Sequence, residues 1–472
     1  MTRSSQRLRE DALAIWRAGV DAVRSDRAVH EFVQVDGRWL VLGDVQFDLN
    51  KIGRIAVVGA GKAGAGMAAG LESALGPDLL AEKEVQGWIN VPADCVRELS
   101  RIHLHAARPA GVNEPTEAGV DGAARILEIV ESLSDRDLCI CLISGGGSAL
   151  LPCPAPGISL ADKQAVTRHL SGAGANIEQF NTVRKQLSRI KGGGLAQACR
   201  AGALVSLIIS DVLGDPLDVI ASGPTVPNTT TAADALEVLE KFGAREAGIS
   251  GAVFACLEEE RGKPDARASA LGETKVTNTI LCNNATAVDA AGMEAERRGY
   301  SHAMSAARKS EGPAEEIGQH LADMALRMRD APGPDCLITG GEPTVELADS
   351  SIRGLGGRNQ QLVLAAIERC FERSNQPIGP LLDGIVLLSG GTDGEDGPTN
   401  AAGALVTPEM FAAIKDQRID IADFLARNDA YHFFEPLDGL IKTGPTHTNV
   451  CDLRVVVVDR IDAEQWGPVN RV

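Results

Sequence analysis

The sequence of 472 residues has few aromatic side chains, only 3% of the total, and no apolar run that approaches the ~20 residues needed to span a bilayer. Its N-terminal stretch, MTRSSQRLREDALAIW, carries charges of both signs where a signal peptide would have an apolar core. We therefore expect neither membrane insertion nor export, and we expect the protein to work in the cytoplasm.

Positive charge is also scarce. The chain has 46 Lys and Arg residues against 64 Asp and Glu residues, which gives a formal net charge of −18. A protein this acidic is a poor candidate for binding nucleic acid or an anionic membrane. A local basic patch can still hold a small anion, so we expect small-molecule ligands.

The ten cysteines form no CxxC pair, and several lie in apolar runs such as LCICLIS. Buried, reduced thiols are the simplest interpretation, and a metal or redox role is the alternative. His103 and His105 could share one strand face as metal ligands. No third ligand accompanies them, so we favour a structural role for this pair.

Glycine, by contrast, is abundant, with 51 residues, and the chain is long enough for two domains. Strand-like runs alternate with helical patterns, which predicts parallel βαβ units. We expect an α/β fold, with a Rossmann-like parallel sheet in an N-terminal domain at 1–245 and a smaller α/β C-terminal domain at 275–472. A charged, helical stretch near 229–270 separates them. The expected strands are 54–58, 85–91, 138–143, 203–209, 277–282, 335–339, 385–389 and 453–458, and the expected helices are 5–25, 63–74, 116–133, 285–298 and 360–369.

One pattern occurs in both halves of the chain: an apolar run, then Ser or Thr, then Gly-Gly. It reads CLISGG at 141–146, CLITGG at 336–341 and VLLSGG at 386–391. The apolar run suits a buried strand, and Gly-Gly allows a sharp turn with exposed N–H groups that can bind an anion. Ordinary tight turns are the alternative for any single copy. Three copies favour a ligand site at the strand ends.

The turn at 59–64, GAGKAG, follows a predicted strand and formally matches the dinucleotide motif GxGxxG. That motif needs an acidic residue at the end of the second strand, where this chain has Asn90. Lys62 adds a cation to a helix N-terminus that already favours anions. A solvated surface lysine is the alternative.

Further candidates surround other glycine-rich or charged turns. The segment 181–194 places several cations before Gly-Gly-Gly, where an anion site competes with a solvated helix face. Asp211 follows a buried strand and could hold Mg²⁺, accept a hydroxyl proton or cap a turn. Arg358 opens a helix with a fork of donors suited to a phosphoryl group. His447 could be a base or a hydrogen-bonded loop residue.

The chain resembles the type II glycerate kinases, the glycerate 2-kinases with a C-terminal MOFRL domain. The resemblance covers nearly the whole chain and rests on eight motifs in the family's order. They are VVGAGKAG (57–64), LISGGGSALL (142–151), NTVRKQLSRIKGGGLA (181–196), SDVLGDPLDVIASGPT (210–225), ITGGEPTVEL (338–347), GLGGRNQQL (354–362), SGGTDGEDGPTNAAG (389–403) and GPTHTNV (444–450).

The resemblance implies ATP-dependent phosphorylation of D-glycerate at its 2-hydroxyl, with a divalent cation such as Mg²⁺, in a cleft between two α/β domains. It implies catalytic roles for Lys62, Arg358 and Asp211. We expect ATP to be held by Gly59, Gly61, Ser144, Gly145, Gly146, Gly147, Ser148, Lys191, Glu342 and Asn449. We expect substrate contacts from Arg184, Asp215 and Ser222, and metal contacts from Asp393 and Asp211.

Two positions depart from the family pattern. Arg108 stands where many members have histidine, and Gln361 replaces an acidic residue. Relatives in tartrate utilisation, often called hydroxypyruvate reductases, keep two alternatives open: a kinase of a related hydroxy acid, and an NAD(P)H-dependent reductase. The oligomeric state also stays open, a homodimer included.

Overall fold

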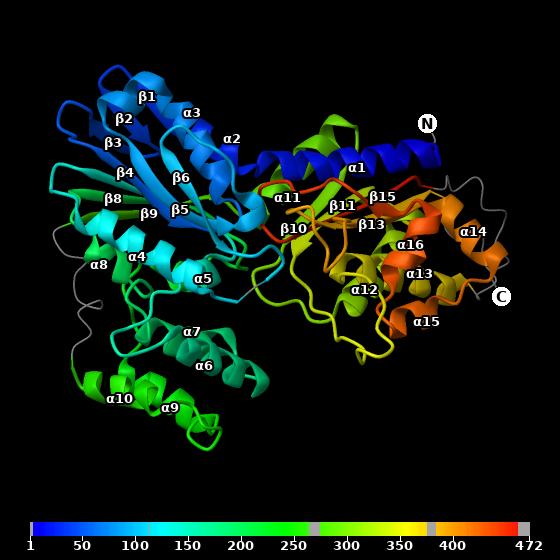
Figure 1. Ribbon diagram of the computed structural model, residues 1–472. Helices are drawn as coiled ribbons and strands as arrows, with labels where there is room; N and C mark the ends of the chain where they lie inside the picture. Colours follow the sequence, from blue (N-terminus) through cyan, green and yellow to red (C-terminus); the bar gives the residue numbers. More distant parts are fainter. Residues whose placement is uncertain (1–2, 113, 264–273, 375–383, 461–472) are drawn as a thin grey trace. The chain divides into compact units, whose positions relative to one another are not determined.

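The computed structural model describes residues 3–112, 114–263, 274–374 and 384–460 (Figure 1). The chain forms two compact units. The N-terminal unit contains residues 24–282 and 447–449. The C-terminal unit contains the described residues up to Val23, those of 283–446, and those from Val450 onward. No helix in the described part of the chain is long and apolar enough to cross a membrane.

A six-stranded sheet forms the centre of the N-terminal unit. Every neighbouring pair in it is parallel, in the order β6-β5-β4-β7-β8-β9. This is the order of a doubly wound Rossmann sheet, in which the direction of winding reverses between β4 and β7. The predicted fold class is therefore confirmed. The strands are β4 (Ile55–Ala60), β5 (Gln86–Pro92), β6 (Ile102–Arg108), β7 (Leu138–Ile143), β8 (Ala203–Ile209) and β9 (Lys275–Cys282).

Helices cover this sheet because their apolar faces match its buried strands. In α4, the side chain of Thr116 caps the N-terminus, and Ile126 and Leu127 pack in one core cluster with Val58 of β4 and Ile143 of β7. The helices of this layer and around it are α2 (Ser25–Phe32), α3 (Gly64–Glu82), α4 (Glu117–Glu131), α5 (Gly147–Leu150) and α8 (Gly194–Ala198), with the short turns η1 (Ala93–Cys95) and η2 (Ile220–Ser222).

Two further parts complete the N-terminal unit. A small antiparallel sheet, β1 (Val33–Asp36), β2 (Trp39–Leu42) and β3 (Val45–Asp48), was not expected from the sequence. Four helices share a core of their own: α6 (Leu160–Gly172), α7 (Ile177–Gln186), α9 (Ala232–Lys241) and α10 (Gly251–Glu260). The last two confirm the helical prediction for 229–263, and the rest of that stretch lies outside the described residues.

The sheet of the C-terminal unit has the order β10-β11-β15-β12-β13-β14. Strands β10 and β11 are parallel, and β15 runs antiparallel to both β11 and β12. The last strand of the chain, β15, thus lies between two earlier strands, β11 and β12. The strands are β10 (His302–Ala306), β11 (Cys336–Gly341), β12 (Ile385–Gly391), β13 (Gly403–Val406), β14 (Leu440–Ile441) and β15 (Asp452–Val458).

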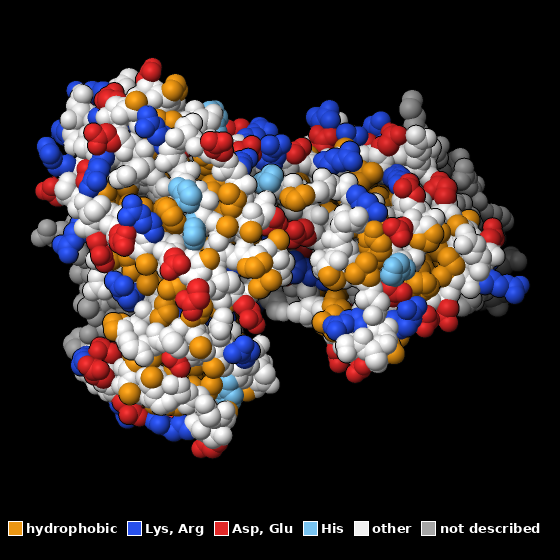
Figure 2. All heavy atoms as spheres, in the orientation of Figure 1, with side chains coloured by type: hydrophobic (Ala, Val, Ile, Leu, Met, Phe, Trp, Pro, Cys, Tyr) orange, Lys and Arg blue, Asp and Glu red, His pale blue; other side chains and the backbone are white. Residues whose placement is uncertain are grey.

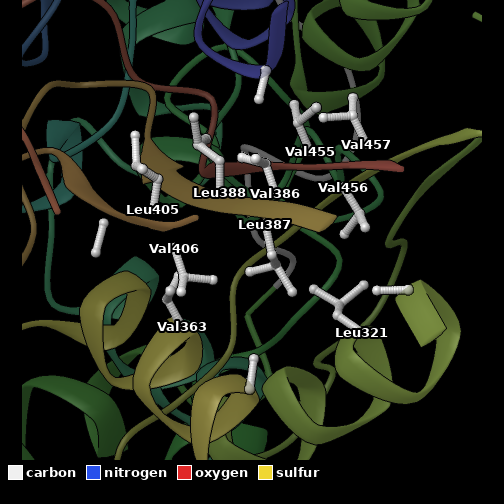
Figure 3. Close-up of a cluster of buried hydrophobic side chains, with 14 of the residues drawn as sticks. Leu321, Val363, Val386, Leu387, Leu388, Leu405, Val406, Val455, Val456 and Val457 are labelled. Carbon is white, nitrogen blue, oxygen red and sulfur yellow. The ribbon is translucent and has the colours of Figure 1, made fainter. Parts of the chain in front are cut away.

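Both faces of this sheet are covered, so its strands are apolar on both sides (Figure 3). Leu387 and Val456 point toward the helices that carry Leu321 and Val363, and Val455 lies on the opposite face. The helices of the unit are α1 (Ser5–Ala22), α11 (Asn284–Arg297), α12 (Ala314–Asp330), α13 (Arg358–Ser374), α14 (Pro408–Gln417), α15 (Ile421–Ala426) and α16 (Ala430–Phe434), with the turn η3 (Glu435–Leu437).

These units differ from the expected domain bounds, 1–245 and 275–472, at two elements. Helix α1 packs on the C-terminal sheet, where the indole N–H of Trp16 donates to the carbonyl oxygen of Gly390 over 3.3 Å. Strand β9 pairs with β8 of the N-terminal sheet. An amphipathic pattern shows that a segment has an apolar face, but the pattern does not identify the sheet that the face covers.

Candidate active site

Two glycine-rich turns meet at the reversal point of the N-terminal sheet. The first, at 59–64, joins β4 to α3, and the second, at 144–147, joins β7 to α5. The backbone N–H of Lys62 donates to the carbonyl oxygen of Gly145 over 2.9 Å, and that of Ala63 donates to the hydroxyl oxygen of Ser144 over 3.0 Å. Ligands of open α/β sheets bind at this position, beyond the carboxyl ends of the strands.

Close approach of the two turns explains their glycines. A Cβ atom on Gly59 would lie 1.9 Å from the carbonyl oxygen of Leu142, and one on Gly61 would lie 2.0 Å from the hydroxyl oxygen of Ser144. Both glycines also have positive φ angles, 155° and 149°. A side chain at either position would force the turns apart.

Charged and amide side chains surround the second turn. A Cβ atom on Gly145 would lie 2.0 Å from Oδ2 of Asp211, and the Nδ2 group of Asn449 donates to that same oxygen over 3.2 Å. A Cβ atom on Gly146 would lie 3.1 Å from Nη2 of Arg108 and 3.6 Å from Cγ of Lys62. The structure therefore brings Lys62, Asp211 and Asn449 together around one turn.

Ser148 and Lys191 lie beside this turn. The Nζ group of Lys191 donates to the carbonyl oxygen of Ser148 over 2.8 Å, and the hydroxyls of Ser148 and Ser222 are 2.7 Å apart. Burial, reinforced by nearby cations, holds the pKa of Lys191 well below its ordinary value. Burial also lowers the pKa of Arg184, whose guanidinium lies over the ring of Phe180.

Asp215 occupies a strained turn after β8. Its φ angle is 55°, and its backbone N–H donates to the carbonyl oxygen of Val212 over 3.0 Å. The backbone of Asp215 thus helps to form the turn, and the substrate contact of its side chain stays a prediction.

Arg358 is the first residue of α13 in the C-terminal unit. Its Nε and Nη2 groups donate to the two carboxylate oxygens of Asp452 over 2.7 and 3.0 Å, and its Nη1 group donates to Glu342 over 2.9 Å. Burial acts to lower the pKa of Arg358, but the two carboxylates raise it overall. Burial raises the pKa of Glu342. One guanidinium thus bridges two acidic side chains.

A second layer of polar groups lies behind this bridge. The carboxylate of Asp396 accepts the backbone N–H groups of Asn359 and Gln360, over 3.0 and 2.9 Å, and so caps the start of α13. The Nδ2 group of Asn359 donates to both Asp396 and Asp452, and Ser389 donates to its Oδ1 over 2.6 Å. Burial raises the pKa of Asp396 to about 7.

Sequence reasoning missed Asp396 and Asp452. The motif TDGEDG contains both Asp393 and Asp396, and only the first was singled out. In the structure, Asp393 closes a loop: its Oδ1 accepts the N–H of Glu395, and its carbonyl oxygen accepts that of Thr446, each over 3.1 Å. An acidic residue at the start of the buried strand DLRVVVV, as Asp452 is, was the available signal.

A metal site was expected at Asp211 and Asp393. The described residues contain no group of three or more His, Cys, Asp or Glu side chains arranged to hold an ion. Mg²⁺ at phosphoryl-transfer sites is held by one or two carboxylates together with substrate phosphates and water. The carboxylate of Asp211, beside the anion-binding turns, fits that kind of site.

Two family models match this chain. Residues 11–258 match the family described as "Domain of unknown function (DUF4147)", and residues 335–452 match the MOFRL family. Human glycerate kinase is 37% identical over 96% of this chain and 94% of its own. The chain belongs to the glycerate kinase family. The resemblance found in the sequence motifs is thereby confirmed.

Other members of the glycerate kinase family agree in sequence and fold. The crystal structure of glycerate kinase from Thermotoga maritima has a TM-score of 0.79 and 32% identity, and the match covers 96% of this chain and all of that one. A protein of Agrobacterium vitis, provisionally named a hydroxypyruvate reductase, is 37% identical over 86% of this chain and 100% of its own. Both names that the motifs suggested therefore occur among relatives.

Proposed function

We propose that the protein transfers the γ-phosphoryl group of ATP to the 2-hydroxyl of D-glycerate. The observation that carries this proposal is the cluster at the reversal point, where a cation, Lys62, and a carboxylate, Asp211, border the same glycine-rich turn. Phosphoryl transfer needs positive charge beside the transferring phosphoryl group and a group that orients the attacking hydroxyl. Membership of the glycerate kinase family supports the choice of acceptor.

Each residue then has a defined role. Lys62, within the turn that precedes α3, stabilises the charge on the transferring phosphoryl group. Asp211 orients the attacking 2-hydroxyl. In the C-terminal unit, Asp452 and Glu342 hold Arg358 in one orientation, and we assign Arg358 the catalytic role that its motif implies. The N–H groups of the turn at 144–147 bind phosphate oxygens. Bound Mg²⁺ would neutralise phosphate charge, with Asp211 as its protein ligand.

The alternative, an NAD(P)H-dependent reductase, requires an acidic residue on the second strand to bind the ribose. In β5 this place belongs to Asn90, which is fully buried. Its Nδ2 group donates to the carbonyl oxygens of Leu150 and Gly119, over 2.8 and 3.3 Å. Asn90 therefore links secondary-structure elements and provides no carboxylate for the ribose. Its contacts favour the kinase over the reductase.

One pair of assays tests the proposal. The protein is incubated with D-glycerate, ATP and Mg²⁺, and ADP release is followed; separately, hydroxypyruvate is added to the protein with NADH, and absorbance at the NADH band is followed. We expect ADP release that depends on D-glycerate. Oxidation of NADH without any ADP release would favour the reductase.

A further inference from the structure

A hydrogen-bonded network of three side chains, Ser148, Ser222 and Asn181, connects the second glycine-rich turn to the interior of the N-terminal unit. The hydroxyl of Ser148 lies 2.7 Å from that of Ser222, and the hydroxyl of Ser222 donates to Oδ1 of Asn181 over 3.0 Å. Ser222 and Asn181 are 0% and 3% exposed, whereas Ser148 is half-buried. Of these three side chains, only Ser148 can therefore contact a ligand.

The position of each hydroxyl proton in this network follows from the number of donors and acceptors. A hydroxyl has one proton, and a carbonyl oxygen can only accept. The proton of Ser222 is used on Oδ1 of Asn181, so Ser222 must accept from Ser148. The proton of Ser148 then points inward, and the outer side of its oxygen carries lone pairs alone. Ser148 consequently offers a ligand an acceptor.

The backbone holds this arrangement in place at a cost. Ala221 and Ser222 both have left-handed φ angles, 51° and 62°, which are strained for residues other than glycine. The N–H of Gly192 donates to the carbonyl oxygen of Ser222 over 2.9 Å, and Lys191 holds the carbonyl oxygen of Ser148. Strain of this kind persists where the surrounding contacts fix one geometry.

Three buried or half-buried cations lie near this network of side chains: Lys163, Arg184 and Lys191. The Nζ groups of the two lysines donate to the carbonyl oxygens of Leu187 and Ser148. Burial lowers the pKa of Lys163 to about 8, and like charges add to the effect. Among the described residues, no carboxylate lies within ion-pair distance of these three cations. Uncompensated buried cations suit a ligand that brings a negative charge.

We propose that Asn181, acting through Ser222, makes Ser148 an acceptor for a second hydroxyl of the substrate, so that the enzyme selects dihydroxy acids over monohydroxy acids. This inference rests on the proposed function, in which the 2-hydroxyl of glycerate is the attacking group at Asp211. The 3-hydroxyl is the donor that remains for Ser148, and the carboxylate matches the neighbouring cations. Asn181 is a positioning residue. Ser148 is here a contact of the acid substrate, in place of the ATP contact that the family resemblance implied.

The test compares D-glycerate with D-lactate, which has the same 2-hydroxyl but lacks the 3-hydroxyl. We expect the wild-type kcat/KM for ATP-dependent phosphorylation to favour D-glycerate about tenfold, the loss expected for one hydrogen bond between neutral groups. Ser148→Ala should bring this ratio close to one. Asn181→Leu should lower it in the same way, because it frees the Ser148 proton through Ser222.

Asn181→Asp separates positioning from packing. A carboxylate can only accept, and the nearby cations favour its charged form, so this variant should keep the wild-type ratio. A ratio that falls in Asn181→Asp, with an unchanged melting temperature, would show that the amide group donates to Ser222 and would overturn the inference. If that variant does not fold, Ser222→Ala replaces it, with a ratio near one expected and an unchanged ratio contradicting the inference.

A control variant tests whether the effect is specific to Ser148, and two outcomes distinguish failure of this inference from failure of the proposed function. Ser132→Ala removes a hydroxyl that donates to the carbonyl oxygen of Ile129 on α4, and it should leave the ratio unchanged. Phosphorylation of D-glycerate with equal efficiency for D-lactate would reject the role of Ser148 alone. Failure of wild-type protein to phosphorylate either acid would reject the proposed function itself.

Discussion

The guanidinium of Arg358 donates two hydrogen bonds, of 2.7 and 3.0 Å, to the two carboxylate oxygens of Asp452. Asp452 is fully buried, whereas the Arg358 side chain is 34% exposed. The Nε and Nη2 groups of the guanidinium are thus bonded to a buried carboxylate. Paired bonds of this type fix orientation as well as charge, so Asp452 determines how the exposed part of Arg358 is presented.

Asp452→Asn should therefore lower kcat for phosphorylation about 100-fold, a size typical of losing one oriented charge at a reacting centre. The amide cannot accept two bonds from the guanidinium, and it removes the compensating charge. Steady-state kinetics and urea unfolding should be measured together. Asp323→Asn, which breaks a partly exposed pair with Arg369 on α13, should leave kcat unchanged. Equal kcat in both variants would contradict this role.

Lys62→Ala should reduce turnover by at least two orders of magnitude while leaving the melting temperature near that of the wild type. The bond between the two turns uses the backbone N–H of residue 62, so removing the side chain leaves it intact. Lys241→Ala, on helix α9, is the matched control for the loss of a lysine. Near-normal turnover of Lys62→Ala would exclude a catalytic role.

Asp396 should make stability depend on pH. Its pKa is raised to about 7 by burial, above the value of ~4 in an unfolded chain, so the folded state binds this proton more tightly. This contribution is present below about pH 4 and is lost as the pH rises through about 7. At ~1.4 kcal/mol per pKa unit, the loss is roughly 4 kcal/mol over this window.

The measurement is urea unfolding of wild type and Asp396→Asn across that pH range. The wild-type free energy of unfolding should fall relative to that of the variant as the pH rises. Parallel curves would show that Asp396 titrates normally. Asn is close in shape to the protonated carboxyl group, and both offer one carbonyl acceptor to the N–H groups of Asn359 and Gln360, so the variant should approach the wild-type stability at acidic pH.

Gly59→Ala should destabilise the N-terminal unit by at least about 3 kcal/mol, because its Cβ would overlap the carbonyl oxygen of Leu142 in the neighbouring strand. Gly172→Ala serves as the control: no heavy atom lies within 4 Å of its Cβ position, and it lies in α6. The control should be neutral or slightly stabilising. Equal stability of the two variants would contradict the close approach of β4 and β7.

The strands next to the glycine-rich turns were the most predictable part of the fold. The ranges 138–143 and 203–209 coincide with β7 and β8, because fully buried parallel strands are continuous apolar runs. The antiparallel sheet at 33–48 was missed, since each strand has only four residues and two of them, β1 and β3, are mostly exposed or half-exposed and alternate apolar with polar residues. On the face drawn in Figure 2, acidic and basic side chains are interspersed over both units, and such surfaces give little periodic signal.

The candidate site shows the same division. Lys62 and Asp211 were found because each follows a buried strand, where local sequence reports on position. Asp452 was missed, and Asn181 was noted only as part of a motif, because their partners, Arg358 and Ser222, lie 94 and 41 residues away. A pairing at that separation depends on which strands and helices become neighbours, and local patterns do not carry that information.

The most direct test of the central claim is ADP formation by the purified protein with ATP, Mg²⁺ and D-glycerate, with the product identified by ³¹P NMR. The account predicts stoichiometric ADP and 2-phosphoglycerate from the wild type, and less than about 1% of that rate from Lys62→Ala. Absence of ADP, together with oxidation of NADH by hydroxypyruvate, would contradict it.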